Sequence, residues 1–124
     1  MYTEKRTFMR IEPSGYMELR DLDPDRDILD VIHEELDGGF FEIVHCRTLP
    51  RKYLMLVDDC GLIKDLKINP IASILYAHGA IAGTALIMRE DFDDGEPDIF
   101  GMTEEDCMEL YRKLRGLIVM TEAE

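Results

Sequence analysis

The alternation of apolar and polar side chains predicts two strands near the start of the chain. Residues 6–12 (RTFMRIE) and 16–22 (YMELRDL) alternate in this way, and Pro, Ser and Gly occupy positions 13–15 between them. Successive side chains of a strand point to opposite faces, so alternation is typical of strands with one buried face. We expect a pair of antiparallel strands joined by a turn.

Two further runs, residues 40–46 (FFEIVHC) and 53–59 (YLMLVDD), are rich in β-branched and aromatic side chains. Such side chains pack well on a pleated surface, and the runs are separated by a short polar segment containing Pro50. They predict a second pair of strands. The most apolar strand is expected at residues 81–90 (IAGTALIMRE), followed by an acidic loop at residues 91–98.

Helix start signals precede the first two predicted helices. Asp23-Pro24 offers a capping side chain followed by Pro, which is well tolerated in the first helical turn. Gly38-Gly39 offers the left-handed residue that often ends a helix. Between these two signals, apolar side chains recur at helical spacing: Ile28, Leu29, Ile32 and Leu36. Asn69-Pro70 similarly precedes a short helix at residues 71–78, which Gly79 is expected to end.

The third predicted helix begins at Thr103. Thr103 and Asp106 resemble a capping box, with Asp in the place of the usual Glu. A helix from this point gathers apolar side chains on one face, and Gly116 is a candidate for its end. These side chains are Cys107, Leu110, Tyr111, Leu114, Leu117 and Ile118.

Together these elements predict an α+β protein with the order ββαββαβα. A mainly antiparallel sheet of about five strands is expected, with three helices packed on it. The chain has 124 residues, which suits a single domain covering residues 1–124. Apolar residues make up 46% of it, enough for an ordinary core.

The net charge of the chain limits the kinds of partner that it can bind. The chain has 27 acidic residues against 14 Lys and Arg, a net charge of −13, and the basic residues are scattered. Direct nucleic-acid binding requires clustered basic residues that displace counterions from phosphates, so this class is excluded. A negative field favours association with basic protein surfaces.

The acidic residues concentrate in two segments. Residues 21–37 contain eight acids against Arg26, and residues 89–109 contain ten against Arg89. Closely spaced carboxylates can imitate the phosphates of DNA, which place one charge about every 1.7 Å of helix axis. The expected interaction face consists of Asp21, Asp23, Asp25, Asp27, Asp30, Glu34, Glu35, Glu90, Asp91, Asp93, Asp94, Glu96, Asp98, Glu104, Glu105 and Glu109.

Neither a metal nor a cofactor is expected. The acids from Asp21 to Asp30 alternate as in a calcium loop, but Arg26 replaces the required Gly and Ile32 replaces the final Glu. Their position near a helix start explains them equally well, because the helix dipole favours acids there. The acids of residues 91–98 have irregular spacing for metal ligands.

Cysteine and histidine side chains supply no recognisable catalytic set. His45 and Cys46 are neighbours on a predicted strand, so their side chains face opposite ways, and Cys107 belongs to an apolar helix face. Together with Cys60, these cysteines form an odd set without CxxC spacing, which favours a reducing cytoplasm. No apolar run is long enough for a signal peptide or a membrane span, so no membrane role is expected.

Several local sequences resemble a family of small proteins that carries a domain of unknown function and occurs in phages, prophages and mobile elements. They are the hairpin ending in YMELRDL, the stretch DGGFFEIV, the segment YLMLVDDCGLIKDLKINPIASILY and the strand IAGTALIM. The resemblance covers roughly residues 6–115. It implies a phage-associated accessory protein with an anti-defence role, and it supplies no site residues. Family members commonly have an amide-and-acid turn where this chain has Asp58-Asp59-Cys60-Gly61.

Three hypotheses about function follow. The first is an interaction protein whose acidic face occupies a basic surface of a host protein, such as the nucleic-acid channel of a defence enzyme. The second is a module that binds a nucleotide-like signal, with a homo-oligomer possible, through aromatic and basic residues: Phe40, Phe41, Tyr53, Arg47, Arg51 and Lys52. The third is an enzyme that uses paired carboxylates, and it rests only on the abundance of acids. A purely structural accessory protein is also compatible with the sequence.

Overall fold

The computed structural model describes residues 5–36 and 40–122, with side chains described up to residue 117. Its elements confirm the α+β class and the predicted order of strands and helices, and a sixth strand follows the fifth directly. The elements are β1 (Thr7–Ile11), β2 (Met17–Asp21), α1 (Ile28–Glu35), β3 (Phe41–Val44), β4 (Tyr53–Asp58), α2 (Pro70–Tyr76), β5 (Ala85–Asp93), β6 (Glu96–Phe100) and α3 (Glu104–Glu122).

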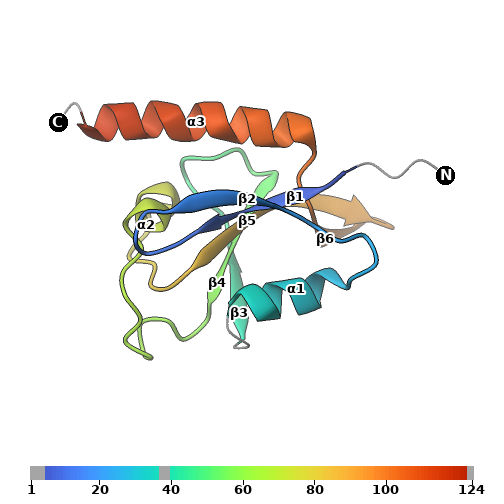
Figure 1. Ribbon diagram of the computed structural model, residues 1–124, viewed down its shortest axis with the longest axis horizontal. Helices are drawn as coiled ribbons and strands as arrows, with labels where there is room; N and C mark the ends of the chain where they lie inside the picture. Colours follow the sequence, from blue (N-terminus) through green and yellow to red (C-terminus); the bar gives the residue numbers. More distant parts are fainter. Residues whose placement is uncertain (1–4, 37–39, 123–124) are drawn as a thin grey trace.

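All strands belong to one antiparallel sheet with the order β2-β1-β5-β4-β3, and β6 pairs with the second half of β5. Figure 1 shows α3 lying along one face of this sheet and α1 against the other. The β5–β6 hairpin extends past the body of the sheet at the end where α3 begins.

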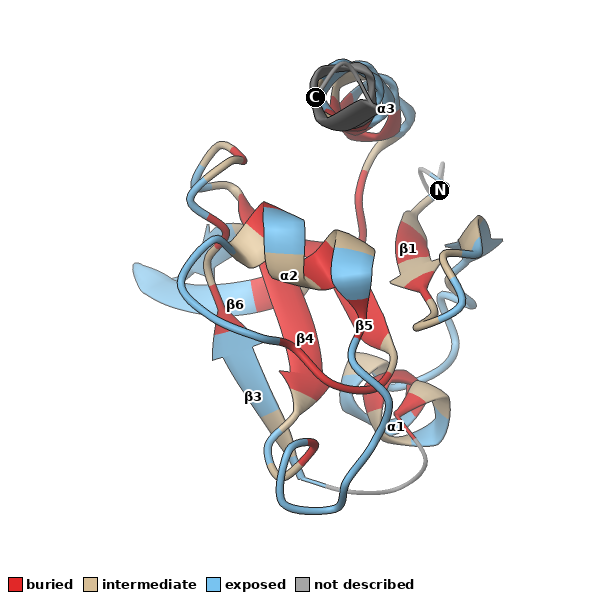
Figure 2. Ribbon diagram, turned by 90° about the vertical axis from the view of Figure 1, so that its left-hand side faces the viewer, coloured by how far each residue is buried: buried red, intermediate tan, exposed pale blue. Residues whose placement is uncertain are grey.

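The sheet separates two apolar cores. On one face, side chains such as Ile11, Met55 and Ile87 pack with residues of α2 and α3. On the other face, side chains that include Phe8 and Leu86 pack with α1. Strand β4 and the first half of β5 are buried at the centre, as Figure 2 shows, because helices cover both of their faces there.

The predicted start of the first helix at Asp23-Pro24 is wrong. Asp23 instead begins a tight turn, in which its carboxylate accepts a hydrogen bond from the Asp25 amide at 2.9 Å. Asp followed by Pro is as favourable at the start of a turn as at a helix start. Helix α1 begins at Ile28, after Asp27 caps the Leu29 amide. The expected stop at Gly38-Gly39 lies outside the described residues.

The Asn69-Pro70 start of α2 is confirmed. The Asn69 side chain accepts a hydrogen bond from the Ala72 amide at 3.1 Å, and Pro70 is the first helical residue. The helix ends earlier than expected, because Ala77 rather than Gly79 takes the left-handed conformation, with φ of 61°.

The capping box of α3 is confirmed in both directions. The Asp106 amide donates to the Thr103 hydroxyl at 3.1 Å, and the Thr103 amide donates to the Asp106 carboxylate at 3.0 Å. Gly116 does not end the helix, which continues to Glu122. Tyr111 is 62% exposed and therefore lies outside the buried face that contains Cys107.

Residues 91–98 form a hairpin rather than the expected loop. They are the paired ends of β5 and β6, joined by Asp94 and Gly95 with φ of 51° and 79°. An Asp-Gly pair with positive φ at both positions is a favoured two-residue turn between antiparallel strands. The acids around the Asp-Gly pair have low strand propensity, so their sequence resembles a loop although the strands pair.

Candidate interaction site

The hairpin formed by residues 90–98, here called the acidic hairpin, is the most concentrated group of exposed acids. Its register places Asp91 opposite Asp98 and Asp93 opposite Glu96. Directly opposed residues of an antiparallel pair lie on the same face of the ribbon, with Cβ atoms about 5 Å apart. Four carboxylates therefore share one face of the acidic hairpin.

This face of the hairpin continues the sheet face that α3 covers. Alternation along β5 puts Asp91 and Asp93 on the same side as Ile87 and Arg89. Ile87 belongs to the core shared with α3, and the Arg89 guanidinium binds Asp106 of α3. The exposed acids at the start of α3, Glu104 and Glu105, therefore border the same side of the molecule.

The basic residues near this face are already engaged. Arg89 donates two hydrogen bonds to the Asp106 carboxylate, at 3.0 and 2.8 Å. The Lys52 ammonium lies 2.6 Å from the Glu109 carboxylate and 3.2 Å from that of Asp106. Across the described ranges, no ion pair involves the remaining acids of this face, which are Asp93, Asp94, Glu96, Asp98, Glu104 and Glu105.

Asp106 is the buried anchor of this region, with 2% of its surface exposed. Burial by itself would raise the pKa of Asp106, but hydrogen bonds from Thr103, Arg89 and Lys52 outweigh it and lower the pKa to about 2. The Tyr53 hydroxyl also donates to the Asp106 carbonyl at 2.8 Å. The start of α3 is thus fixed to β4 and β5 beside the acidic hairpin.

The opposite face of the hairpin carries an exposed aromatic side chain. Phe92 is 64% exposed and pairs with Pro97. Closer to the sheet on that face, Ile99 is buried in the core under α1, and Glu90 lies 3.4 Å from the His45 ring. An exposed aromatic ring beside carboxylates is the kind of anchor that protein interfaces favour.

Acids of the first segment have local structural roles. Asp23 and Asp27 accept backbone hydrogen bonds, as described above. Glu35 is half-buried between Arg10 and Arg20, each 2.6 Å from one of its carboxylate oxygens. Asp21 and Glu34 form surface ion pairs with Lys5 and Arg26, whereas Asp25 and Asp30 are exposed.

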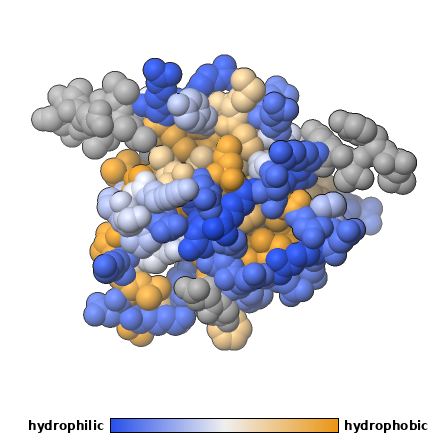
Figure 3. All heavy atoms as spheres, viewed as in Figure 1, coloured by the Kyte–Doolittle hydropathy of each residue, from blue (hydrophilic) through white to orange (hydrophobic). Residues whose placement is uncertain are grey.

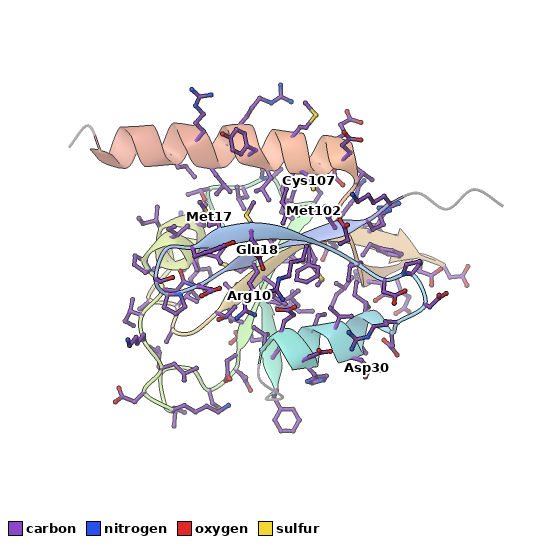
Figure 4. The ribbon with its side chains drawn as sticks, in the orientation of Figure 1. Arg10, Met17, Glu18, Asp30, Met102 and Cys107 are labelled. Carbon is purple, nitrogen blue, oxygen red and sulfur yellow. The ribbon has the colours of Figure 1, made fainter. Side chains whose placement is uncertain are left out.

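The structure does not bring the two acidic segments into one group. In Figure 2, β6 and α1 lie on different sides of the view, although the connection from β2 to α1 starts close to the base of the hairpin, where Leu22 lies against Gly101. Asp30 points away from the sheet on α1, as labelled in Figure 4. The predicted face therefore consists of a locally compensated group around α1 and an uncompensated group formed by the acidic hairpin and the start of α3.

The cysteine and histidine candidates are dispersed. Cys46 is buried, which raises the pKa of its thiol to about 12. Cys107 is buried beneath α3 with its sulfur 2.8 Å from the Thr7 hydroxyl (Figure 4). In the described part of the chain, no three His, Cys, Asp or Glu side chains are placed to hold a metal ion.

Residues of the ligand-binding hypothesis do not converge either. Phe41 pairs with Asp58 at one end of the β3–β4 hairpin, whereas Arg47 and Arg51 lie in the connection at its other end. Tyr53 is buried, and Lys52 is engaged by Glu109, as described above. Phe40, which is 82% exposed, precedes β3 and is separated from the basic residues by the strand.

A cleft of about 430 Å³ lies elsewhere, between α3 and the β1–β2 hairpin. Its lining is largely apolar and includes Met9, Met17 and Leu114. Figure 4 shows Met17 directed from β2 toward α3, while Glu18 and Arg10 point toward the opposite side of the sheet. Among the helices of the described residues, none is both long and apolar enough to cross a membrane.

The fold and the site define a small α+β protein with a projecting acidic hairpin. Residues 5–115 match the model of a domain of unknown function (DUF3846), and the chain belongs to this family. The expected membership of a family of unknown function is thus confirmed, while an origin in phages or mobile elements stays a prediction.

Comparison with solved structures finds a similar fold in the crystal structure of the small RNA methyltransferase HEN1. The TM-score is 0.59 at 14% sequence identity, and the match covers 92% of this chain but 16% of that one. At this identity the likeness concerns the fold alone. Comparison with curated proteins finds no match.

Proposed function

We propose that this protein is an interaction protein whose acidic hairpin binds a basic surface of a partner protein. The observation that carries the proposal is the register of the hairpin, which sets Asp91 against Asp98 and Asp93 against Glu96. Like charges directly opposite each other destabilise an antiparallel pair by a few tenths of a kcal/mol or more. Arginine or lysine side chains of a partner would remove this repulsion and gain hydrogen bonds to the carboxylates.

Spacing within the hairpin favours a partner that normally binds phosphates. Residues two apart on one strand are about 7 Å apart, and cross-strand neighbours are closer, so the carboxylates form a compact two-row array. A groove that binds nucleic acid presents basic residues to such an array. In a phage or mobile element, a host defence enzyme with a nucleic-acid channel would be the partner, and its inhibition the function.

The test is affinity capture from bacterial lysate at low salt, followed by titration of the captured protein against two variants. The hairpin variant D91N/D93N/E96Q/D98N removes four charges from the array. The matched control D21N/D25N/D30N/E34Q removes four exposed charges near α1 and leaves the same net charge. We expect binding to fall at least tenfold in the hairpin variant and to stay near wild type in the control.

Two results would contradict the proposal. Equal losses in both variants would mean that the bulk charge, and not the hairpin, attracts the partner. Binding that is insensitive to salt between about 50 and 500 mM would exclude an interface between exposed opposite charges.

A further inference from the structure

Helix α3 carries an exposed stripe that the described parts of the chain leave uncovered. Glu104, Met108, Tyr111 and Arg115 follow one another at spacings of four, three and four residues, which places them on one face of a helix. All four are exposed, and the apolar pair at the centre is prominent, with Met108 59% and Tyr111 62% exposed. We refer to these four residues as the α3 stripe.

The α3 stripe is complementary to itself when its direction is reversed. Read from one end it is acid, apolar, apolar, base, and an antiparallel copy presents base, apolar, apolar, acid. We propose that α3 packs antiparallel against α3 of a second copy of this chain, around a two-fold axis that passes between Glu109 and Leu110. Glu104 then faces Arg115 of the other copy, and Met108 faces its Tyr111.

Charge along the helix selects this arrangement. The first turns of α3 contain acids, including Glu105, while the later exposed positions include Arg112 and Arg115. In the described chain neither arginine forms an ion pair. A parallel pair would set Glu104 against Glu104 and Arg115 against Arg115, and would be repelled at both ends. A uniformly basic partner would be repelled by the arginines, so a second copy fits the stripe better.

Apolar surface continues beside the stripe. Tyr111 and Arg115 border the cleft between α3 and β2, whose other side includes Leu19, which is 51% exposed. Figure 3 shows apolar side chains gathered on this side of the molecule, below α3. A second copy seated on the stripe would cover the mouth of this cleft and extend the contact toward Leu19.

The proposed contact between the two α3 helices is short, so we expect a weak dimer. From residue 104 to residue 115 the helix rises about 16 Å, and a single helix pair of this length buries less than the roughly 800 Å² per partner of a standard interface. We therefore expect a monomer–dimer equilibrium with a dissociation constant in the micromolar to millimolar range.

Charge reversal tests the pairing directly. In E104R and in R115E, each homodimer would place two like-charged pairs at its ends. In E104R, positions 104 and 115 are both basic, and in R115E both are acidic. A dimer of one E104R chain with one R115E chain therefore places opposite charges together at both ends. The measurement is sedimentation equilibrium of the wild type, each variant and the equimolar mixture, at about 50 and 500 mM salt, with thermal denaturation confirming that each variant is folded.

We expect each single variant to dimerise at least tenfold more weakly than wild type, and the mixture to recover dimers that are heterodimers. The double variant E104R/R115E should also dimerise, because both of its pairs are exchanged. A wild-type chain that stays monomeric up to about 1 mM would overturn the proposal. So would a dimer that tolerates both reversals, or single variants that the mixture fails to rescue.

Discussion

A single buried carboxylate decides how α3 joins the sheet. Asp106 closes the capping box with Thr103 and also binds Arg89 on β5 and Lys52 beside β4. A capping box alone would start the helix but would leave its orientation free. Because the same carboxylate holds one cation on β5 and another just before β4, the start of the helix and its position on the sheet depend on one side chain.

Replacing Asp106 with Asn should therefore destabilise the protein by about 2–3 kcal/mol. The change keeps a capping group but removes the charge that compensates Arg89, which is itself only partly exposed. Urea denaturation measures the loss. The control is Glu105→Gln, one residue earlier and exposed, which should cost less than about 1 kcal/mol. Similar losses in both variants would show that Asp106 acts only through the helix dipole.

The pH dependence of stability provides a second test of Asp106. Its pKa is about 2 in the folded chain against 3.8 for an ordinary Asp, so folding favours the ionised form. The resulting stability, about 2 kcal/mol, is complete above pH 4 and is lost as the pH falls from 4 to 2. The D106N variant lacks this titration, and its stability should fall less steeply over that interval. Parallel curves for the two proteins would contradict the assignment.

At the scale of elements, the turn of the acidic hairpin rests on the conformation of Gly95. Its φ of 79° is unfavourable for residues with a side chain, and an added Cβ would meet no atom within 4 Å. Gly95→Ala should thus weaken the hairpin by about 1 kcal/mol through backbone strain alone. Faster amide exchange in β6 would report the change.

Replacing Gly116 with Ala provides a control, because this change should raise stability, whereas Gly95→Ala should lower it. Gly116 lies inside α3 in open space, where Ala is the better helix former, so Gly116→Ala should stabilise the protein by about 0.5–1 kcal/mol. Unchanged exchange in β6 of the Gly95→Ala variant would mean that the hairpin does not depend on a left-handed residue at this position.

Elements were predictable from the sequence where one local signal dominated. The β1–β2 hairpin and the starts of α2 and α3 followed from alternation and from caps that act within four residues. Where two local signals competed, prediction failed: Asp23-Pro24 suits a turn as well as a helix start. At Asp94-Gly95 the turn signal was correct, but the acidic residues on both sides suggested a loop.

The arrangement of charges could not be predicted in this way, because it depends on contacts between distant parts of the chain. Sequence located the two acidic segments but gave no sign that Arg10 and Arg20 would neutralise Glu35. It also did not reveal that Lys52 and Arg89 would be engaged within the second segment. The difference between a compensated and an uncompensated group of acids emerged only with the pairing of the sheet.

For the molecule as a whole, this arrangement means that stability and binding oppose each other in the acidic hairpin. The chain carries a net charge of −13, and its hairpin sets like charges opposite one another. Most salt bridges among the described residues have at least one partly exposed partner, and such pairs contribute about 1 kcal/mol or less each, so screening them costs little compared with screening the repulsion. Repulsion among the acids should dominate the response of the free protein to salt.

Raising the salt concentration from about 10 to 500 mM should therefore increase the melting temperature of the free protein by several degrees. A gain of about 1 kcal/mol corresponds to roughly 4 °C for a chain of this size. The hairpin variant D91N/D93N/E96Q/D98N should melt higher than wild type at low salt and respond less to added salt, because its main repulsion is absent. Calorimetry of both proteins measures this. If salt lowered both melting temperatures equally, attractive ion pairs would outweigh the repulsion, and the hairpin would not be the strained acidic surface proposed above.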